Sequence, residues 1–116
     1  EMKYISVEEL ELLSFFEVEP KRTDPDVPWP YNEYSYHVEL DTYYVSFRIS
    51  VAYKDVSISI THNGNEIYSF KALSVDDVRY NKDGHLETLE IVVSERDTIL
   101  FRLRPTVLIT QNADAT

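Results

Sequence analysis

Three histidines are the first candidates for catalysis or metal binding in this 116-residue sequence. His37, His62 and His85 include no pair at the spacing that would place two metal ligands on one helical face, and two of the three fall in predicted turns. We therefore predict no metal site and interpret all three as ordinary surface or turn residues.

Carboxylates are abundant, since the chain has 21 acidic side chains against 11 basic ones and a formal net charge of -10. Glu39 and Asp41 would share one face of a strand, and so would Glu17 and Glu19. Paired carboxylates act in hydrolysis only where a cleft drives their pKa values apart. Because aspartate and glutamate are seldom buried, we interpret these pairs as a solvated acidic surface.

The sequence has only two glycines, Gly64 and Gly84, and no cysteine. Glycine-rich phosphate loops and the dinucleotide fingerprint need closely spaced glycines, and thiolate zinc sites and cysteine nucleophiles need a thiol. The nucleophile-elbow, zinc-protease and calcium-loop motifs are also missing from the sequence. We therefore predict that the protein is not an enzyme and binds no cofactor.

Residues 17–36 are the best candidate for a functional segment, since they hold four of the five prolines and the only tryptophan. Pro28 and Pro30 stiffen the backbone around Trp29, so little entropy would be lost if the indole entered a pocket on a partner. Trp29 could instead cap the sheet core, and both interpretations stay open. Aromatic anchors in charged surroundings are typical of protein interfaces, and the predicted partner contacts are Glu17, Glu19, Asp24, Asp26, Trp29, Tyr31, Glu33 and Tyr34.

The negative charge is concentrated in the N-terminal third of the chain. Residues 1–41 contain eleven acidic side chains against three basic ones, whereas residues 42–116 contain ten against eight. Such an excess repels nucleic acid and anionic membranes, whose binding needs clustered lysine and arginine. It attracts a cationic protein and speeds the encounter. We therefore expect a basic protein partner, and neither nucleic acid nor a membrane.

The elements that must position the segment are a helix and a series of strands. Residues 6–13 predict a short helix that begins in a capping box of Ser6 and Glu9 and turns Leu10 and Leu13 toward the core. Residues 74–77 predict a single helical turn. Alternating apolar and polar side chains predict strands at residues 35–40, 43–52, 56–61, 66–70, 86–93, 99–103 and 106–110.

These elements predict one mainly β domain of the α+β type. A short N-terminal helix within residues 1–16 precedes a six- to seven-stranded, mostly antiparallel sheet that forms a sandwich or a partly closed barrel. Residues 17–36 form an ordered, extended arm, residues 37–110 the β body, and residues 111–116 a flexible polar tail.

The predicted hairpin around residues 63–64 has a strong turn signal, Asn-Gly. A three-residue loop would pair Ile58 with Tyr68 and Val56 with Phe70, and would keep all four on one face. The alternative two-residue turn would pair Ile60 with Ile67.

The predicted hairpin across residues 94–98 gives one apolar face and sets Glu90 opposite Arg102, a cross-strand ion pair. The pairs that produce this face are Val93–Ile99, Ile91–Phe101 and Leu89–Leu103.

Taken as a whole, the chain resembles the small acidic immunity proteins of bacterial contact-dependent inhibition and other polymorphic toxin systems. The resemblance covers the full length and depends on size, acidity, absence of cysteine, an expected start at Met2 without an export signal, and a β-rich body with an acidic aromatic arm. It implies a cytoplasmic, non-enzymatic inhibitor that is a monomer alone and a heterodimer with its cognate toxin domain. It also implies that the toxin is a nuclease whose cationic active site the inhibitor blocks.

Two other functions stay open. A small-ligand-binding β-barrel or sandwich, with or without enzymatic activity, would place Arg48, Tyr43, Tyr53 and His62 around a pocket, and a filled core would count against it. An adaptor subunit would pair with its partner through an edge strand such as Thr106–Thr110.

Overall fold

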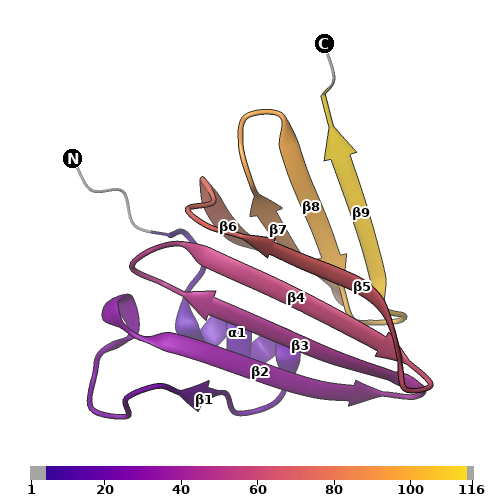
Figure 1. Cartoon of the computed structure of the whole chain (residues 1–116), viewed down its shortest axis with the longest axis horizontal. Helices are drawn as coiled ribbons and strands as arrows, with labels where there is room; N and C mark the ends of the chain where they lie inside the picture. The colour runs from indigo at the N-terminus through magenta and orange to yellow at the C-terminus, as the bar shows by residue number, and fades with distance from the viewer. Residues whose placement is uncertain (1–4, 115–116) are drawn as a thin grey trace.

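The computed structural model describes residues 5–114, which form one helix and nine strands in two antiparallel sheets (Figure 1). Within these residues the sheets do not close into a barrel. The predicted mainly β class with a short N-terminal helix is confirmed. The ends of the predicted helix and tail, residues 1–4 and 115–116, lie outside the described residues, and so does the expected start at Met2.

The first sheet has the strand order β1-β2-β3-β4-β5. Apolar side chains alternate with polar ones along β2, β3 and β4, so one face of the sheet is buried and the other is polar. The strands are β1 (Lys21–Arg22), β2 (Glu33–Leu40), β3 (Tyr43–Ser50), β4 (Asp55–His62) and β5 (Asn65–Ala72).

The second sheet has the order β6-β7-β8-β9. Its strands are β6 (Asp77–Asp83), β7 (Leu86–Val92), β8 (Asp97–Arg102) and β9 (Leu108–Ala113). The sequence analysis missed β1 and β6. It also placed residues 111–113 in a flexible tail, which is wrong because these residues pair with β8 as the end of β9. Residues 74–77 form no helical turn, since Ser74 has a left-handed φ of 53° and Asp77 already begins β6.

The helix α1 (Glu9–Phe16) begins later than predicted. Its N-cap is Glu8, whose amide donates to Glu11 Oε1 at 2.9 Å, so the capping box uses a different pair from the one predicted. Ser6 instead donates its hydroxyl to Asp77 Oδ2 at 2.5 Å. Leu10 is 76% exposed, and the residues that α1 buries are Leu12, Phe15 and Phe16.

α1 joins the two sheets in one hydrophobic core, and in Figure 1 it passes behind β2 and β3. The ring centroid of Phe16 lies 4.6 Å from that of Tyr36 and 5.1 Å from that of Phe47, both in the first sheet. It also lies 6.4 Å from that of Phe101 in the second sheet. The buried faces of the two sheets therefore both pack against the last turn of α1.

The β4–β5 hairpin has the two-residue turn that was the alternative considered from the sequence, and its first two pairs are in the register of that turn. His62 pairs with Asn65 across a two-residue turn, in which Asn63 and Gly64 both have positive φ, as this turn type requires. A bulge follows, so the next pairs are Ile60–Tyr68, Ile58–Phe70 and Val56–Ala72. The bulge leaves Ile67 58% exposed and returns Tyr68 and Phe70 to the core side, so the predicted common face is correct although the pairs are wrong.

The β7–β8 hairpin is shifted by two residues from the prediction. The amides of Val93 and Ser94 both donate to the Asp97 carbonyl, which tightens the turn and lets β8 begin at Asp97. Two-residue shifts keep the same face, so the apolar face survives with the pairs Ile91–Ile99 and Leu89–Phe101. The predicted Glu90–Arg102 pair is wrong. Glu90 forms an ion pair with Arg79 of β6 at 3.5 Å, and Arg102 donates to Thr88 Oγ1 at 3.0 Å.

Candidate functional site

Residues 23–32 form an ordered loop that leads into the start of β2, and Asn32 holds it together. Only 4% of Asn32 is exposed, and its side-chain amide donates to the carbonyls of Asp24 (2.6 Å) and Val27 (3.2 Å). Its Oδ1 accepts from the amides of Glu33 (2.8 Å) and Asp24 (3.4 Å). The sequence analysis did not identify Asn32, because the value of a single asparagine depends on which carbonyls the fold brings to it.

The backbone of this loop is stiff. Asp24 Oδ1 accepts from the Asp26 amide at 3.0 Å, and the Val27 amide donates to the Asp24 carbonyl at 3.1 Å, which closes a turn around Pro25. The Pro-Trp-Pro motif continues into a 3₁₀ turn, η1 (Trp29–Tyr31). A loop fixed in this way loses little entropy on binding, as expected for a preformed contact surface.

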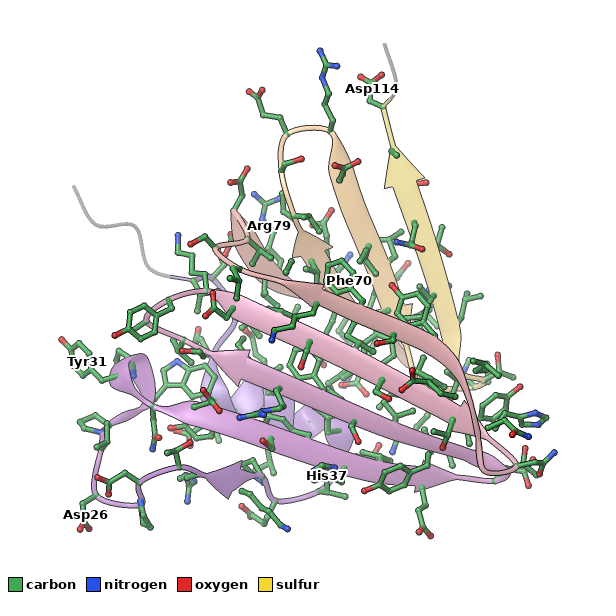
Figure 2. All side chains as sticks on the ribbon, in the orientation of Figure 1. Asp26, Tyr31, His37, Phe70, Arg79 and Asp114 are labelled. Carbon is green, nitrogen blue, oxygen red and sulfur yellow. The ribbon has the colours of Figure 1, made fainter. Side chains whose placement is uncertain are left out.

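The aromatic residues of the loop have different environments. Tyr31 is 66% exposed and points away from the molecule, and Asp26 lies at the same end of the first sheet (Figure 2). Trp29 is half-buried against the core, with its ring 4.6 Å from that of Tyr34. The indole therefore caps the sheet, as one of the two interpretations expected, and retains an accessible part.

Tyr34 is 1% exposed, so its side chain cannot contact a partner and its place among the predicted contacts is wrong. The reason is that β2 begins at Glu33, two residues earlier than predicted, and its alternation turns Tyr34 inward with Tyr36. The guanidinium of Arg22 lies 5.8 Å from the Tyr34 ring centroid, within cation–π range.

The predicted acidic contacts fall into two groups. Asp24 and Asp26 are exposed in the turn next to η1, and Glu33, which is partly exposed, pairs with Arg48 on β3. Glu17 and Glu19 lie at the other side of β1, where Glu17 forms an ion pair with Arg104 at 3.4 Å. The structure therefore places Asp24, Asp26, Trp29, Tyr31 and Glu33 in the loop before β2 or at the first residue of β2, and we call these five residues the η1 surface. Glu17 and Glu19 lie outside it.

The residues proposed for a ligand pocket do not meet. Tyr43 and His62 are cross-strand neighbours with ring centroids 4.6 Å apart, at one end of the first sheet. Tyr53 is 73% exposed in the turn at the opposite end of β3, and Arg48 pairs with Glu33 on the polar face. The inner face of the sheet is filled by apolar side chains, which counts against the ligand-binding barrel.

The histidines show no arrangement for chemistry. His37 Nδ1 lies 3.1 Å from Ser46 Oγ, and its ring stacks at 6.1 Å on that of Tyr44. Within residues 5–114 no three acidic or histidine side chains are grouped so that they could hold a metal ion. Nor does this part of the chain contain a helix of the length and apolarity that crossing a bilayer requires.

The strand considered for an adaptor function is placed at an edge. β9 pairs only with β8 among the described residues, so its other side is free for a further strand. It spans Leu108–Ala113 rather than residues 106–110.

Comparison with known proteins gave a strong structural similarity. No protein-family model matches the sequence, and no curated protein matches it. A chain of a solved structure, described as a contact-dependent growth inhibition toxin–immunity protein complex from Klebsiella pneumoniae 342, is similar with a TM-score of 0.75 and 25% sequence identity. The similarity covers 97% of the present chain and 100% of the other chain. The resemblance to immunity proteins of contact-dependent inhibition that the sequence suggested is therefore confirmed.

Proposed function

We propose that this protein is an immunity protein that binds the toxin domain of a contact-dependent inhibition system and blocks its active site. The observation that carries the proposal is the similarity over nearly the whole chain to a component of such a toxin–immunity complex. Of the two roles in that complex, the acidity of this chain favours the immunity protein, because a toxin that acts on nucleic acid must attract phosphates.

The toxin that fits an inhibitor of this charge best is a nuclease that acts in the cytoplasm of the cell. A nuclease presents a cationic cleft to its substrate, and a protein with a net charge of -10 can occupy that cleft in place of the phosphates. Electrostatic attraction between such surfaces can raise association rates to about 10⁸–10⁹ M⁻¹s⁻¹ at low salt. The inhibitor acts by covering the cleft in a heterodimer and has no catalytic role of its own.

The η1 surface is the proposed centre of contact. It combines an exposed tyrosine, the accessible part of Trp29 and two exposed aspartates on a stiff backbone. Tight complexes need a desolvated aromatic anchor as well as charge, and Tyr31 is the side chain most free to supply it. Glu17 and Glu19, at a distance from this surface, would add long-range attraction rather than direct contact.

The test compares variants of the η1 surface in binding to the cognate toxin domain. We expect Tyr31→Ala to weaken binding about tenfold or more, because it removes the anchor. We expect Asp26→Lys to slow association at low ionic strength and to have less effect at high ionic strength, since salt screens exposed charges. Isothermal titration calorimetry and stopped-flow kinetics measure the two effects.

Matched controls are Tyr44→Ala and Asp83→Lys, which make the same changes at exposed positions on β3 and β6 away from η1. Equal losses in the controls and in the η1 variants would show that the contact lies elsewhere. A wild-type chain that does not bind the toxin domain would contradict the proposed function itself. Trp29→Ala and Asp24→Lys are poorer tests, because Trp29 packs on Tyr34 and Asp24 closes the loop.

A further inference from the structure

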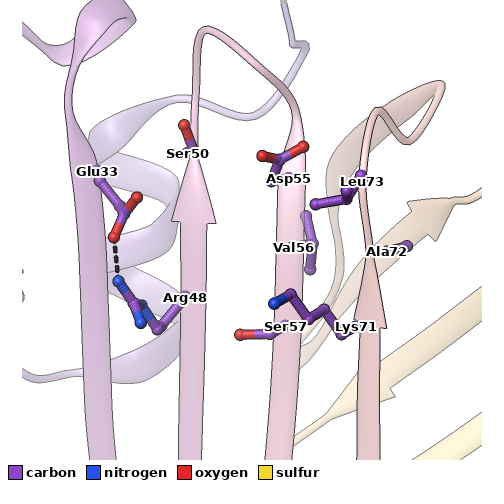
Figure 3. A pocket seen from close by; sticks show the side chains of 9 residues that line it. All are labelled: Glu33, Arg48, Ser50, Asp55, Val56, Ser57, Lys71, Ala72 and Leu73. Carbon is purple, nitrogen blue, oxygen red and sulfur yellow. Dashed lines mark hydrogen bonds and ion pairs between the residues drawn. The ribbon is translucent and has the colours of Figure 1, made fainter.

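The polar face of the first sheet has an open pocket that no helix, strand or loop of the described residues fills. The pocket has a volume of about 270 Å³ and opens to solvent between the start of β2 and the end of β5 (Figure 3). Its walls carry two basic side chains, Arg48 and Lys71, two acidic ones, Glu33 and Asp55, and the hydroxyls of Ser50 and Ser57. The sequence analysis used Arg48 only as a candidate for a ligand barrel and did not consider Lys71.

The strand register places the two cations on either side of one serine. Arg48 pairs with Ser57 across β3 and β4, and Ser57 pairs with Lys71 across β4 and β5. Neighbouring strands lie about 4.8 Å apart, so the two basic residues are two strand spacings apart with a hydroxyl between them. Lys71 extends across β4 toward Ser57 in Figure 3. An anion seated above Ser57 can therefore be reached from both sides.

The acidic side chains of the pocket are already engaged. Glu33 Oε1 pairs with Arg48 Nη2, and Asp55 Oδ1 accepts from the Ser74 amide at 3.0 Å. The Lys71 side chain has no hydrogen bond or ion pair with any described residue. A guanidinium has five donors, so Arg48 can bind a second carboxylate without releasing the first. The pocket therefore holds one unpaired cation and one partly used cation.

We propose that this pocket receives the carboxylate of an aspartate or glutamate side chain of the toxin domain, an inference that rests on the proposed function. A singly charged carboxylate suffers less repulsion from Glu33 and Asp55 than a doubly charged phosphate does. The pocket also has one exposed apolar side chain that suits the methylene groups of an acidic side chain, namely Leu73, which is 69% exposed. Free phosphate has no methylene groups that could pack against this apolar side chain.

In this contact the inhibitor would supply the positive charge and the toxin the negative one, whereas the charges are the other way round in the rest of the interface. An acidic protein attracts many basic surfaces, whereas a cationic pocket at a defined position accepts only a partner that presents an acid there. Glu33 belongs both to the η1 surface and to the pocket, so the two contacts are continuous. The pocket would therefore select the cognate toxin among basic proteins.

The decisive variant is Lys71→Glu, with Lys82→Glu on β6 as the matched control. Both changes make the protein more acidic by the same amount, and both side chains are exposed. If only overall charge matters, both variants bind the basic toxin domain as tightly as the wild type or more tightly. We expect Lys71→Glu to weaken binding about tenfold and Lys82→Glu to leave it unchanged or slightly tighter.

Lys71→Gln, which removes the charge without reversing it, should give an intermediate loss. Circular dichroism and thermal unfolding of each variant separate loss of binding from loss of folding. Equal affinities of the Lys71→Glu and Lys82→Glu variants would overturn the proposal.

A second measurement needs no toxin and keeps the two proposals separable. The free protein is titrated with N-acetylglutamate α-amide, whose only charge is the side-chain carboxylate, or with sodium phosphate at matched ionic strength, and amide resonances are followed by NMR. We expect N-acetylglutamate α-amide to shift the amides of Ser57 and Lys71, and the shifts to disappear in Lys71→Glu. A stronger response to phosphate, or no response to N-acetylglutamate α-amide, would overturn the proposal. If the wild-type chain failed to bind toxin but still showed these shifts, only the proposed function would fail.

Discussion

Asp77 is the one buried acidic residue among residues 5–114, with 3% of its surface exposed. It accepts hydrogen bonds from the amide of Ser6 at 2.7 Å and from its own neighbour Val78 at 2.8 Å, and its second oxygen accepts from the Ser6 hydroxyl and from Arg79. Burial opposes the charge, but these donors together lower the pKa of the Asp77 carboxyl. The carboxylate therefore fastens the segment before α1 to the start of β6.

Replacement of this carboxylate should destabilise the fold in a pH-dependent way. We expect Asp77→Asn to lower the free energy of unfolding by about 2 kcal/mol at neutral pH, because donors aimed at a charge lose their partner. A lowered pKa in the folded state stabilises the protein above the pKa of the unfolded chain, and this stabilisation is lost as pH falls through the folded-state pKa. The difference between the variant and the wild type should therefore shrink in acid.

Urea unfolding at neutral and at acidic pH measures this difference. Asp76→Asn, an exposed neighbour, is the control and should change little at either pH. If the free energies of unfolding of the wild type and Asp77→Asn differed by the same amount at both pH values, Asp77 would contribute through its shape and not through its charge.

At the scale of single elements, the loop that carries the η1 surface depends on Asn32. We expect Asn32→Asp to destabilise the protein by about 2 kcal/mol, because a carboxylate of the same shape would face the carbonyls of Asp24 and Val27 with no donor for them. Amide hydrogen exchange should then rise in residues 24–32 before it rises in the sheets.

Asn81→Asp on β6 has the same chemistry at an exposed position and serves as the control. Unchanged exchange in residues 24–32 of Asn32→Asp would show that the prolines alone hold the loop. Weaker toxin binding by a variant that still folds would connect the stiffness of the loop with its function.

The elements also show how far the sequence could predict this molecule. Strands of seven or eight residues with alternating side chains, such as β2 and β3, were predicted within two residues of their ends, since the alternation is local and repeats several times. β1 has two residues and exists only because β2 lies beside it, so no local pattern indicates it. β6 was missed because its outer half, Asn81–Asp83, is polar and resembles a turn.

The residues that pair across neighbouring strands were harder to predict than the face of each strand that is buried. A bulge at Ile67 and a tight turn at Ser94 each changed the pairing, yet both preserved which side chains are buried, because burial constrains the face and the turn sets the pairing.

The candidate site could be predicted only in part, for a similar reason. Aromatic and acidic residues of the arm were identified from composition, but only the true start of β2 shows that Tyr34 points inward. Asn32 binds carbonyls five and eight residues before it, and Lys71 comes near Arg48 only through the pairing of β3, β4 and β5, so no local pattern indicates either residue.

At the scale of the whole molecule, charge and shape have separate tasks. In the proposed function, the excess of acidic side chains in residues 1–41 would supply long-range attraction to a basic partner, which is fast and unselective. The η1 surface and the pocket beside it lie at one end of the first sheet and would supply the short-range contacts. A toxin that covers both would be held in one orientation.

The most direct test of this account is the growth of bacteria that produce the cognate toxin domain, with and without this chain. We predict that the wild-type chain restores growth, that a Tyr31→Ala, Asp26→Lys double variant fails to restore it although it folds, and that the Tyr44→Ala, Asp83→Lys control protects fully. Arrested growth in cells that contain the folded wild-type chain in excess over the toxin would contradict the account.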